Sequence, residues 1–403
     1  MARASREMQA SGRASQLPAS PIRRLAPLAE AAKERGIHVH HLNIGQPDLA
    51  PPESITRLLE RASGEELVYA PARGASDAVS AWQIYYSHHS VDLEREDMLI
   101  TAGASEALML ALLTTCDPGD DVLLPEPFYA PYKGLLSITG LNPIPIPSGP
   151  DFAPPDADVV RSLVTPNTRA MLICSPSNPT GTVYGQNDLE KVGAVAVEND
   201  FFLLSDETYR EIVFDGPAAP SALAIPGLEE CAVVIDSVSK RFNVCGLRIG
   251  CLASRNRAVI DAALEIAELR LAVPMIDQRA VVSALTSPRP YVDTVVEAYR
   301  ERKDAVVNAL RAIPGVVAHP PGGAFYVVAD LPVDDAEAFS AWMLREIAIN
   351  DETVMLTPMI DFYATPGTGT TQVRIACVYD AETLTRAISI VGKALEDYPG
   401  RTG

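Results

Sequence analysis

The chain has 403 residues, of which 47% are hydrophobic and 21% are charged, and this composition is typical of a globular protein. Its length predicts about two domains. The formal net charge of −19 argues against nucleic acid and acidic membrane surfaces as partners, because both repel a polyanion. The chain contains no run of about 18 apolar residues, so we expect no membrane-spanning helix. The six cysteines are scattered without a Cys-x-x-Cys pair, which favours free thiols in a reducing compartment, the cytoplasm, over disulfides or a metal site.

The N-terminal 19 residues are rich in Ala, Ser and Arg and lack the apolar centre of a secretory signal. Their composition is shared with organelle transit peptides, but we expect residues 1–19 to form a disordered extension. Apolar residues at helical spacing then predict a helix over residues 21–33. Residues 38–48 read as an extended piece that ends in a Gly/Pro loop. Its three histidines predict no metal site, since no companion cluster of ligands is apparent.

Continuous apolar runs predict buried strands near residues 98–101, 121–124, 170–174, 201–204 and 232–236. Helical segments separate these runs, which is typical of a largely parallel sheet with helices on both faces. In such a sheet the functional site lies at the carboxyl ends of the strands. A long polar helix over residues 291–312 leads to a second unit, with strands near residues 322–328, 353–356 and 372–377.

The most informative residue is Lys240, which follows the last apolar run and the serines Ser237 and Ser239, with Arg248 eight residues later. Such an amine can form a Schiff base with an aldehyde cofactor. The hydroxyls and the guanidinium can bind the oxygens of a phosphate. Taken alone, such a lysine is more often a surface lysine beside a buried ion pair, and only the other motifs of the chain overturn that interpretation.

Two other strand ends carry residues suited to the same kind of ligand. Gly103, Ala104 and Ser105 turn one strand into a helix, and small residues there leave backbone N–H groups open to an anion. Asp206 follows the apolar run 201–204, where a carboxylate can face a pyridinium N–H. Arg374 has apolar neighbours on a strand, which is an unusual place for an unpaired cation, and a structural salt bridge is the alternative.

Together these segments resemble, in order, the motifs of fold-type I pyridoxal-phosphate enzymes, in particular class I/II aminotransferases of the aspartate aminotransferase kind. Residues 237–250 resemble the lysine loop, and Asn178-Pro179-Thr180-Gly181 is a specific signature. The resemblance runs from about residue 20 to the C-terminus. It implies an α/β fold with a mostly parallel seven-stranded sheet between helices in a large domain, residues 50–290. It also implies a smaller α+β domain over residues 291–403, against which residues 20–49 pack.

The resemblance also implies the cofactor and the residues that hold it. Lys240, Asp206 and Tyr209 would be catalytic, with Asp206 keeping the ring nitrogen protonated and Tyr209 facing the 3′-oxygen. Tyr129 would stack on the ring. Tyr69 would cross a homodimer interface to the phosphate in the neighbouring subunit, so that the active sites are shared. The residues implied to bind pyridoxal 5′-phosphate are Tyr69, Gly103, Ala104, Ser105, Tyr129, Asn178, Asp206, Tyr209, Ser237, Ser239, Lys240 and Arg248.

Gly45, Asn178 and Arg374 are implied to bind the substrate, with Arg374 gripping its α-carboxylate through paired hydrogen bonds. The implied reaction moves the α-amino group of an L-amino acid, aspartate-like in the favoured case, to a 2-oxo acid, with 2-oxoglutarate favoured. The same scaffold also supports β- or γ-elimination or replacement, oxidation and ring-forming condensation, which stay open. A non-catalytic binding protein is disfavoured by the complete set of cofactor residues.

Recognition of the substrate side chain is less defined. Some relatives place a lysine for the distal carboxylate where this chain has Ser105. Arg270 is a candidate replacement, although an arginine on a helix surface is the alternative. Asp361 is a candidate to repel an acidic substrate or to pair with a basic one.

Overall fold

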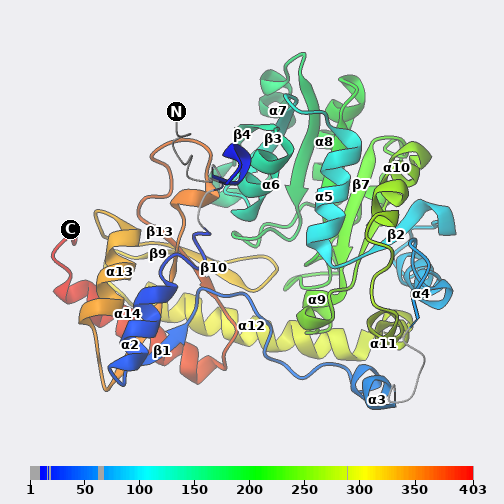
Figure 1. Ribbon diagram of the computed structural model, residues 1–403. Coiled ribbons are helices and arrows are strands. Elements are labelled where there is room, and N and C mark those ends of the chain that lie inside the picture. Colours follow the sequence, from blue (N-terminus) through cyan, green and yellow to red (C-terminus); the bar gives the residue numbers. More distant parts are fainter. Residues whose placement is uncertain (1–9, 16, 18–19, 62–67, 288, 403) are drawn as a thin grey trace, which may run out of the picture.

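The computed structural model describes residues 10–15, 17, 20–61, 68–287 and 289–402. These residues form two lobes, each built around its own sheet, with the long helix α12 (Arg289–Arg311) running along the base of both (Figure 1). We call them the large lobe and the small lobe. Of the expected N-terminal extension, residues 1–9, 16 and 18–19 lie outside the described residues, and Gly12–Ser15 forms the short helix α1.

The described part of the large lobe contains a seven-stranded sheet in the order β2-β8-β7-β6-β5-β3-β4. Its strands are β2 (Met98–Thr101), β3 (Asp121–Glu126), β4 (Asn142–Pro147), β5 (Thr168–Cys174), β6 (Phe202–Asp206), β7 (Ala232–Ser237) and β8 (Gly250–Ala253). All neighbours are parallel except β8, which runs antiparallel to both β2 and β7. The predicted mostly parallel seven-stranded sheet is therefore confirmed.

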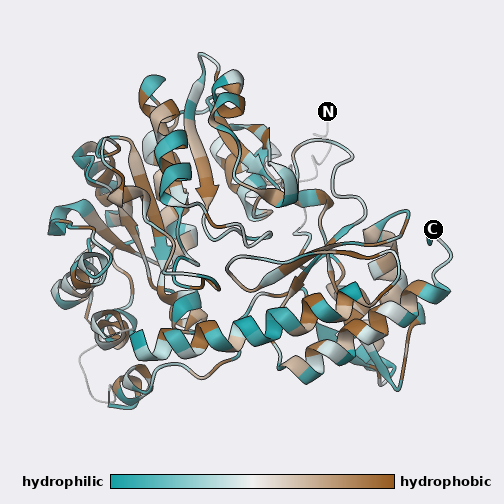
Figure 2. Ribbon diagram, turned by 180° about the vertical axis from the view of Figure 1, so that it is seen from behind, coloured by the Kyte–Doolittle hydropathy of each residue, from teal (hydrophilic) through white to brown (hydrophobic). Residues whose placement is uncertain are grey.

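Helices cover both faces of this sheet because successive residues of a strand point to opposite sides. In β2, Met98 and Ile100 enter one core and Leu99 enters the other. One face packs against α4 (Ser76–Ser87), α8 (Gln186–Glu198) and α11 (Met275–Thr286). The opposite face packs against α5 (Ala104–Thr115), α6 (Pro131–Thr139) and α10 (Arg257–Glu268). Figure 2 shows the hydrophobic strands enclosed between helices whose outer faces are hydrophilic. Three short helices, α3 (Glu53–Arg61), α7 (Ala157–Leu163) and α9 (Val238–Arg241), complete this lobe.

Two strands of the sheet were absent from the prediction, each for a physical reason. The edge strand β4 carries three prolines, which an edge tolerates because the missing N–H groups need not pair. The strand β8 has four residues and begins with Gly250. A Cβ at Gly250 would lie 2.6 Å from the carbonyl carbon of Gly103, so glycine permits the close packing of β8 beside β2.

The small lobe contains a four-stranded antiparallel sheet in the order β12-β13-β10-β9 among the described residues. Its strands are β12 (Thr357–Pro358), β13 (Gln372–Ala376), β10 (Tyr326–Asp330) and β9 (Val317–His319). Near the N-terminus, β1 (His38–His41) pairs in parallel with β11 (Glu352–Met355), so segments from both ends of the chain meet in this lobe. The helices α13 (Ala336–Glu346) and α14 (Ala381–Asp397) pack around them.

The N-terminal helix is shorter than predicted. Residues 21–25 form a turn, and α2 spans Ala26–Glu34. Pro27 occupies one of the first two helical positions, where its missing N–H removes no helical hydrogen bond. Across the described ranges, no helix combines the length and apolar character needed to cross a membrane.

Candidate active site

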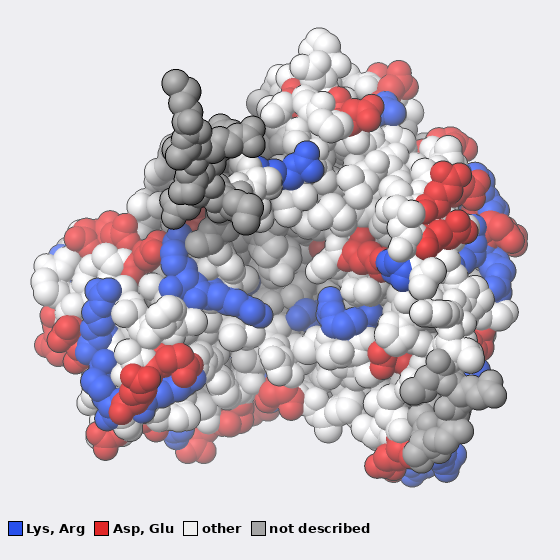
Figure 3. Space-filling model, viewed as in Figure 1, with Lys and Arg blue, Asp and Glu red and all other residues white. Residues whose placement is uncertain are grey.

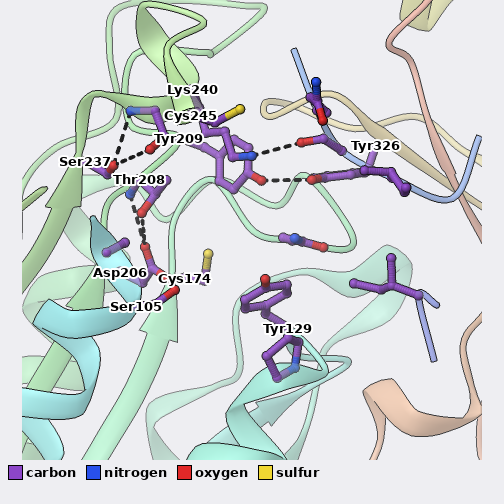
Figure 4. A pocket seen from close by; sticks show the side chains of 18 of the residues that line it. Ser105, Tyr129, Cys174, Asp206, Thr208, Tyr209, Ser237, Lys240, Cys245 and Tyr326 are labelled. Atoms are coloured by element: carbon purple, nitrogen blue, oxygen red, sulfur yellow. Dashed lines mark hydrogen bonds between the residues drawn. The ribbon is translucent and has the colours of Figure 1, made fainter. Parts of the chain in front are cut away.

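A cavity of about 450 Å³ lies between the two lobes, at the carboxyl ends of β5, β6 and β7. Figure 4 shows side chains from both lobes converging on it, with Asp206 and Lys240 from the large lobe and Tyr326 from the small lobe. The predicted site residues that line the cavity are Gly45, Ala104, Ser105, Tyr129, Asn178, Asp206, Tyr209, Ser237, Ser239, Lys240, Arg248 and Arg374.

Two predicted residues do not line this cavity. Gly103 caps α5 just outside it with φ 77°, and a Cβ there would lie 2.5 Å from Nη2 of Arg248. A side chain at this position would therefore displace the guanidinium from the helix N-terminus. Tyr69 is 80% exposed and makes no part of the cavity wall in this chain.

The lysine loop begins where β7 ends. The hydroxyl of Ser237 accepts a hydrogen bond from the backbone N–H of Ser239 at 3.2 Å and so caps the one-turn helix α9, which presents Lys240. The Lys240 amine donates to the carbonyl oxygen of Gly45 at 2.8 Å. Burial lowers the pKa of Lys240 to about 8. Near neutral pH an appreciable fraction of this amine is therefore unprotonated, which is the form that attacks a carbonyl.

A second group of residues forms a cup beside the N-terminus of α5. The Ser237 hydroxyl donates to the carbonyl oxygen of Ile249 at 2.9 Å, and its oxygen lies 2.8 Å from the Ser239 hydroxyl. Arg248 donates from Nη1 to the carbonyl oxygen of Cys245 at 2.9 Å and from Nη2 to the carbonyl oxygen of Ala102 at 3.5 Å, and no carboxylate of the described chain pairs with it. Free backbone N–H groups, the Ser239 hydroxyl and an unpaired guanidinium together suit a phosphate.

The carboxylate of Asp206 is fixed by donors on two sides. Tyr132 donates to Oδ2 at 2.8 Å, and Thr208 donates to Oδ1 from its hydroxyl at 2.6 Å and from its backbone at 3.1 Å. Burial raises the pKa of Asp206, whereas the hydrogen bonds from Thr208 and Tyr132 act in the opposite direction. A cationic N–H placed against this carboxylate would further favour its ionised form.

Two tyrosines from different lobes meet at the floor of the cavity. The hydroxyls of Tyr209 and Tyr326 lie 2.8 Å apart (Figure 4). A Cβ at Gly45 would lie 1.8 Å from the Tyr326 hydroxyl oxygen. Glycine is therefore required for the N-terminal segment to pass this close to Tyr326.

Arg374 is 1% exposed, and its hydrogen-bonding capacity is only partly used. Nη1 donates to the side-chain oxygen of Asn178 at 2.9 Å and Nη2 to the carbonyl oxygen of Asn43 at 2.7 Å, while Nε has no hydrogen-bond partner. The guanidinium also lies over the ring of Tyr326, 4.4 Å from its centre. No carboxylate of the described residues pairs with it, so the salt-bridge alternative is not observed. A buried, unpaired guanidinium is costly, and an anionic ligand would offset that cost.

The two candidates for side-chain recognition are engaged elsewhere. Nε of Arg270 pairs with Glu106 at 2.6 Å, and its Nη2 donates to the carbonyl oxygen of Ile100 at 2.9 Å, outside the cavity wall. Asp361 pairs with Arg24 at 3.0 Å. Arg270 lines neither this cavity nor its neighbour, whereas Asp361 lines an adjoining cavity of about 340 Å³ that shares Ser105, Tyr129 and Asp206 with this one.

The structure adds cavity residues that the sequence did not single out. Cys174 ends β5 in register with Asp206 on β6, a position that strand pairing alone would have revealed. Thr208 follows Asp206 by two residues, and the same turn brings it to the cavity. Tyr326 and Arg23 carried no local signal, because they reach the cavity from the small lobe and from the N-terminal turn.

Comparison with known proteins agrees with this geometry. Residues 37–391 match the family model for aminotransferase class I and II. The aspartate/prephenate aminotransferase of Thermus thermophilus is 30% identical over 371 residues, which cover 90% of this chain and 92% of that protein. The solved structure of aspartate aminotransferase from Thermus thermophilus with maleate superposes with a TM-score of 0.87 and 28% identity, covering 96% of this chain and all (100%) of that one. Alanine aminotransferase from Pyrococcus furiosus superposes with a TM-score of 0.88 and 27% identity, covering 97% and 100%.

Proposed function

Because the chain belongs to the class I and II aminotransferase family, whose members use pyridoxal 5′-phosphate, we propose that it transfers the α-amino group of an L-amino acid to a 2-oxo acid, with the cofactor held by a Schiff base to Lys240. The observation that carries this proposal is one cavity that contains a buried amine, a buried carboxylate and a buried, unpaired guanidinium. Aspartate-like donors and 2-oxoglutarate are the favoured pair, since the Thermus thermophilus relative is named for aspartate.

The residues present fit this cofactor. Asp206, held by two hydroxyl donors, suits the ring nitrogen, and the cup formed by Ser239, Arg248 and the N-terminus of α5 suits the phosphate. Gly103 leaves the space that Arg248 occupies there. When bound, the cofactor supplies an aldehyde that condenses with amines and a ring that delocalises negative charge from the substrate Cα.

The chain's own residues then perform the remaining tasks. Lys240 would take the proton from the substrate Cα and deliver it to C4′ of the cofactor, on the other side of the amino nitrogen, a role that suits an amine with a pKa of about 8. Arg374 holds the substrate α-carboxylate through its unused N–H groups. Asn178 and Tyr209, which line the same cavity, would hydrogen-bond the 3′-oxygen of the cofactor, and Tyr129 would pack on its ring.

We also infer that the protein is a homodimer with shared active sites. Val68 beside Tyr69 is 57% exposed, and Leu269 and Leu271 are 86% and 51% exposed. The last two flank Arg270, whose Nη1 donates to the carbonyl oxygen of Ala72 at 3.4 Å, three residues beyond Tyr69. A second copy of the chain would bury this surface. Tyr69, itself 80% exposed, would then reach the phosphate cup of the neighbouring subunit.

The test is transamination by the purified, cofactor-loaded protein. We expect L-aspartate and 2-oxoglutarate to yield glutamate, and we expect Lys240→Ala to abolish this reaction. Lys191→Ala, at an exposed position on α8, serves as the control and should retain it. Release of ammonia from an amino acid without any 2-oxo acid would contradict transfer and favour elimination or oxidation on the same scaffold.

A further inference from the structure

One cation of the cavity has no role in the chemistry described so far. Lys240, Arg248 and Arg374 are accounted for by the cofactor and the substrate α-carboxylate, but Arg23 lines the same cavity. It lies in the turn that precedes α2 and is exposed. Figure 3 shows basic side chains reaching from both lobes toward the central hollow.

Arg23 differs from its neighbour in having its charge unpaired. Among the described residues, no side chain or carbonyl accepts a hydrogen bond from the Arg23 guanidinium, and no carboxylate pairs with it. Arg24, by contrast, pairs with Glu337 at 2.5 Å and with Asp361 at 3.0 Å. Arg24 therefore links the turn to the small lobe, whereas the guanidinium of Arg23 is available to bind a ligand.

The turn is also tied directly to the residue that we assign to the α-carboxylate. The side-chain amide of Asn43 donates to the carbonyl oxygen of Ile22 at 2.7 Å, and the carbonyl oxygen of Asn43 accepts from Arg374 at 2.7 Å. A single residue thus holds both the turn that bears Arg23 and the guanidinium of Arg374. Asn43 therefore helps to position both Arg23 and Arg374 at the same cavity.

The charges of the cavity wall favour a ligand with more than one acidic group. In the described chain, four cationic side chains face the cavity and Asp206 is the acidic residue that lines it. A phosphate and one carboxylate satisfy Arg248 and Arg374, which leaves Arg23 without an anion. A cationic cavity in a protein of net charge −19 also concentrates small anions locally.

We propose that Arg23 binds the distal acidic group of the substrate, so that the enzyme acts on amino acids and 2-oxo acids with a second carboxylate or similar anionic group. This inference rests on the proposed aminotransferase function and specifies its substrate class. Arg23 would perform, from the N-terminal turn, the task that neither Ser105 nor the paired Arg270 performs. The competing arrangement places an apolar substrate side chain in the adjoining cavity of about 340 Å³, whose wall includes Leu108, Leu135 and Ile138.

The test uses the cofactor-loaded enzyme with Arg23→Gln and Arg23→Lys. In Arg23→Gln, the ratio of kcat/KM for L-aspartate to that for L-alanine should fall by about 5- to 20-fold. This decrease is near the low end of what loss of a charge-assisted hydrogen bond causes, because Arg23 is exposed to solvent. Arg23→Lys should retain most of the ratio, since the positive charge remains. Arg57→Gln, at an arginine on α3 that pairs with Glu53 on the surface, controls for loss of one positive charge.

A binding measurement separates failure of this proposal from failure of the proposed function. Calorimetric titration with succinate, which has two carboxylates and no amino group, should show weaker binding to Arg23→Gln than to the wild type, with propionate as the monocarboxylate reference. This readout does not depend on turnover. An unchanged aspartate-to-alanine ratio together with unchanged succinate affinity would overturn the role of Arg23, and a preference for apolar amino acids would favour the adjoining cavity. Absence of transamination with every amino acid would instead refute the proposed function.

Discussion

The replacement Arg374→Lys gives a quantitative test of how the substrate is held. The five N–H groups of this guanidinium are divided, with Nη1 serving Asn178, Nη2 serving Asn43 and Nε serving no acceptor. Nε and the second hydrogen of one Nη are therefore available for a paired interaction with a carboxylate. Lysine keeps the charge but cannot form two parallel hydrogen bonds.

The expected loss is that of about one charge-assisted hydrogen bond, roughly 1.5–3 kcal/mol. At about 1.4 kcal/mol per decade this corresponds to a decrease of roughly 10- to 150-fold in kcat/KM. Initial rates over a range of L-aspartate concentrations measure it directly. Arg161→Lys controls for the substitution itself, because Arg161 lies on the surface of α7 and pairs with Glu198 at the end of α8. A change of less than about twofold in Arg374→Lys would refute the assignment of Arg374 to the α-carboxylate.

Two further predictions concern the surroundings of the lysine loop. Arg241 is 1% exposed and forms ion pairs with Asp236 and Glu211. Arg241→Met removes the cation that pairs with these two buried carboxylates, so it should lower the free energy of unfolding, measured by urea titration, by about 3–5 kcal/mol. The same replacement at the exposed Arg57 should lower it by only about 0–1 kcal/mol. Separately, Lys240 in the cofactor-free protein has its pKa lowered from 10.5 to about 8, so the unfolded chain binds more protons between these values. The free energy of unfolding, measured relative to Lys240→Met, should therefore rise with pH across that window, and a fall would contradict the burial of the amine.

The sequence was informative where structure depends on residues close together in the chain. Continuous apolar runs identified β6 and β7, and Asp206 and Lys240 could be assigned because Asp206 ends β6 and Lys240 lies three residues beyond the end of β7. The short strand β8 escaped because four residues with a leading glycine carry little periodic signal. β4 escaped because its prolines oppose a strand assignment except at an edge.

Side-chain pairing between distant segments was beyond the reach of the sequence. Arg270 reads as a free cation near the pocket, yet Glu106, 164 positions away, neutralises it. Arg23 and Arg24 are indistinguishable in a helical pattern, but the fold places one at the cavity and pairs the other with Glu337. Which cations remain available to a ligand therefore depends on tertiary contacts that no local pattern encodes.

The central claim is that Lys240 carries the cofactor, and chemical trapping tests it most directly. The cofactor-loaded protein is reduced with borohydride, digested, and its peptides are identified by mass spectrometry. We predict that the reduced cofactor is attached to Lys240. Lys133, whose amine donates to the carbonyl oxygen of Tyr363 at 2.5 Å beside the adjoining cavity, should stay unmodified. Attachment at Lys133 or at any other lysine, or recovery of an unmodified Lys240 peptide from fully loaded protein, would contradict the account.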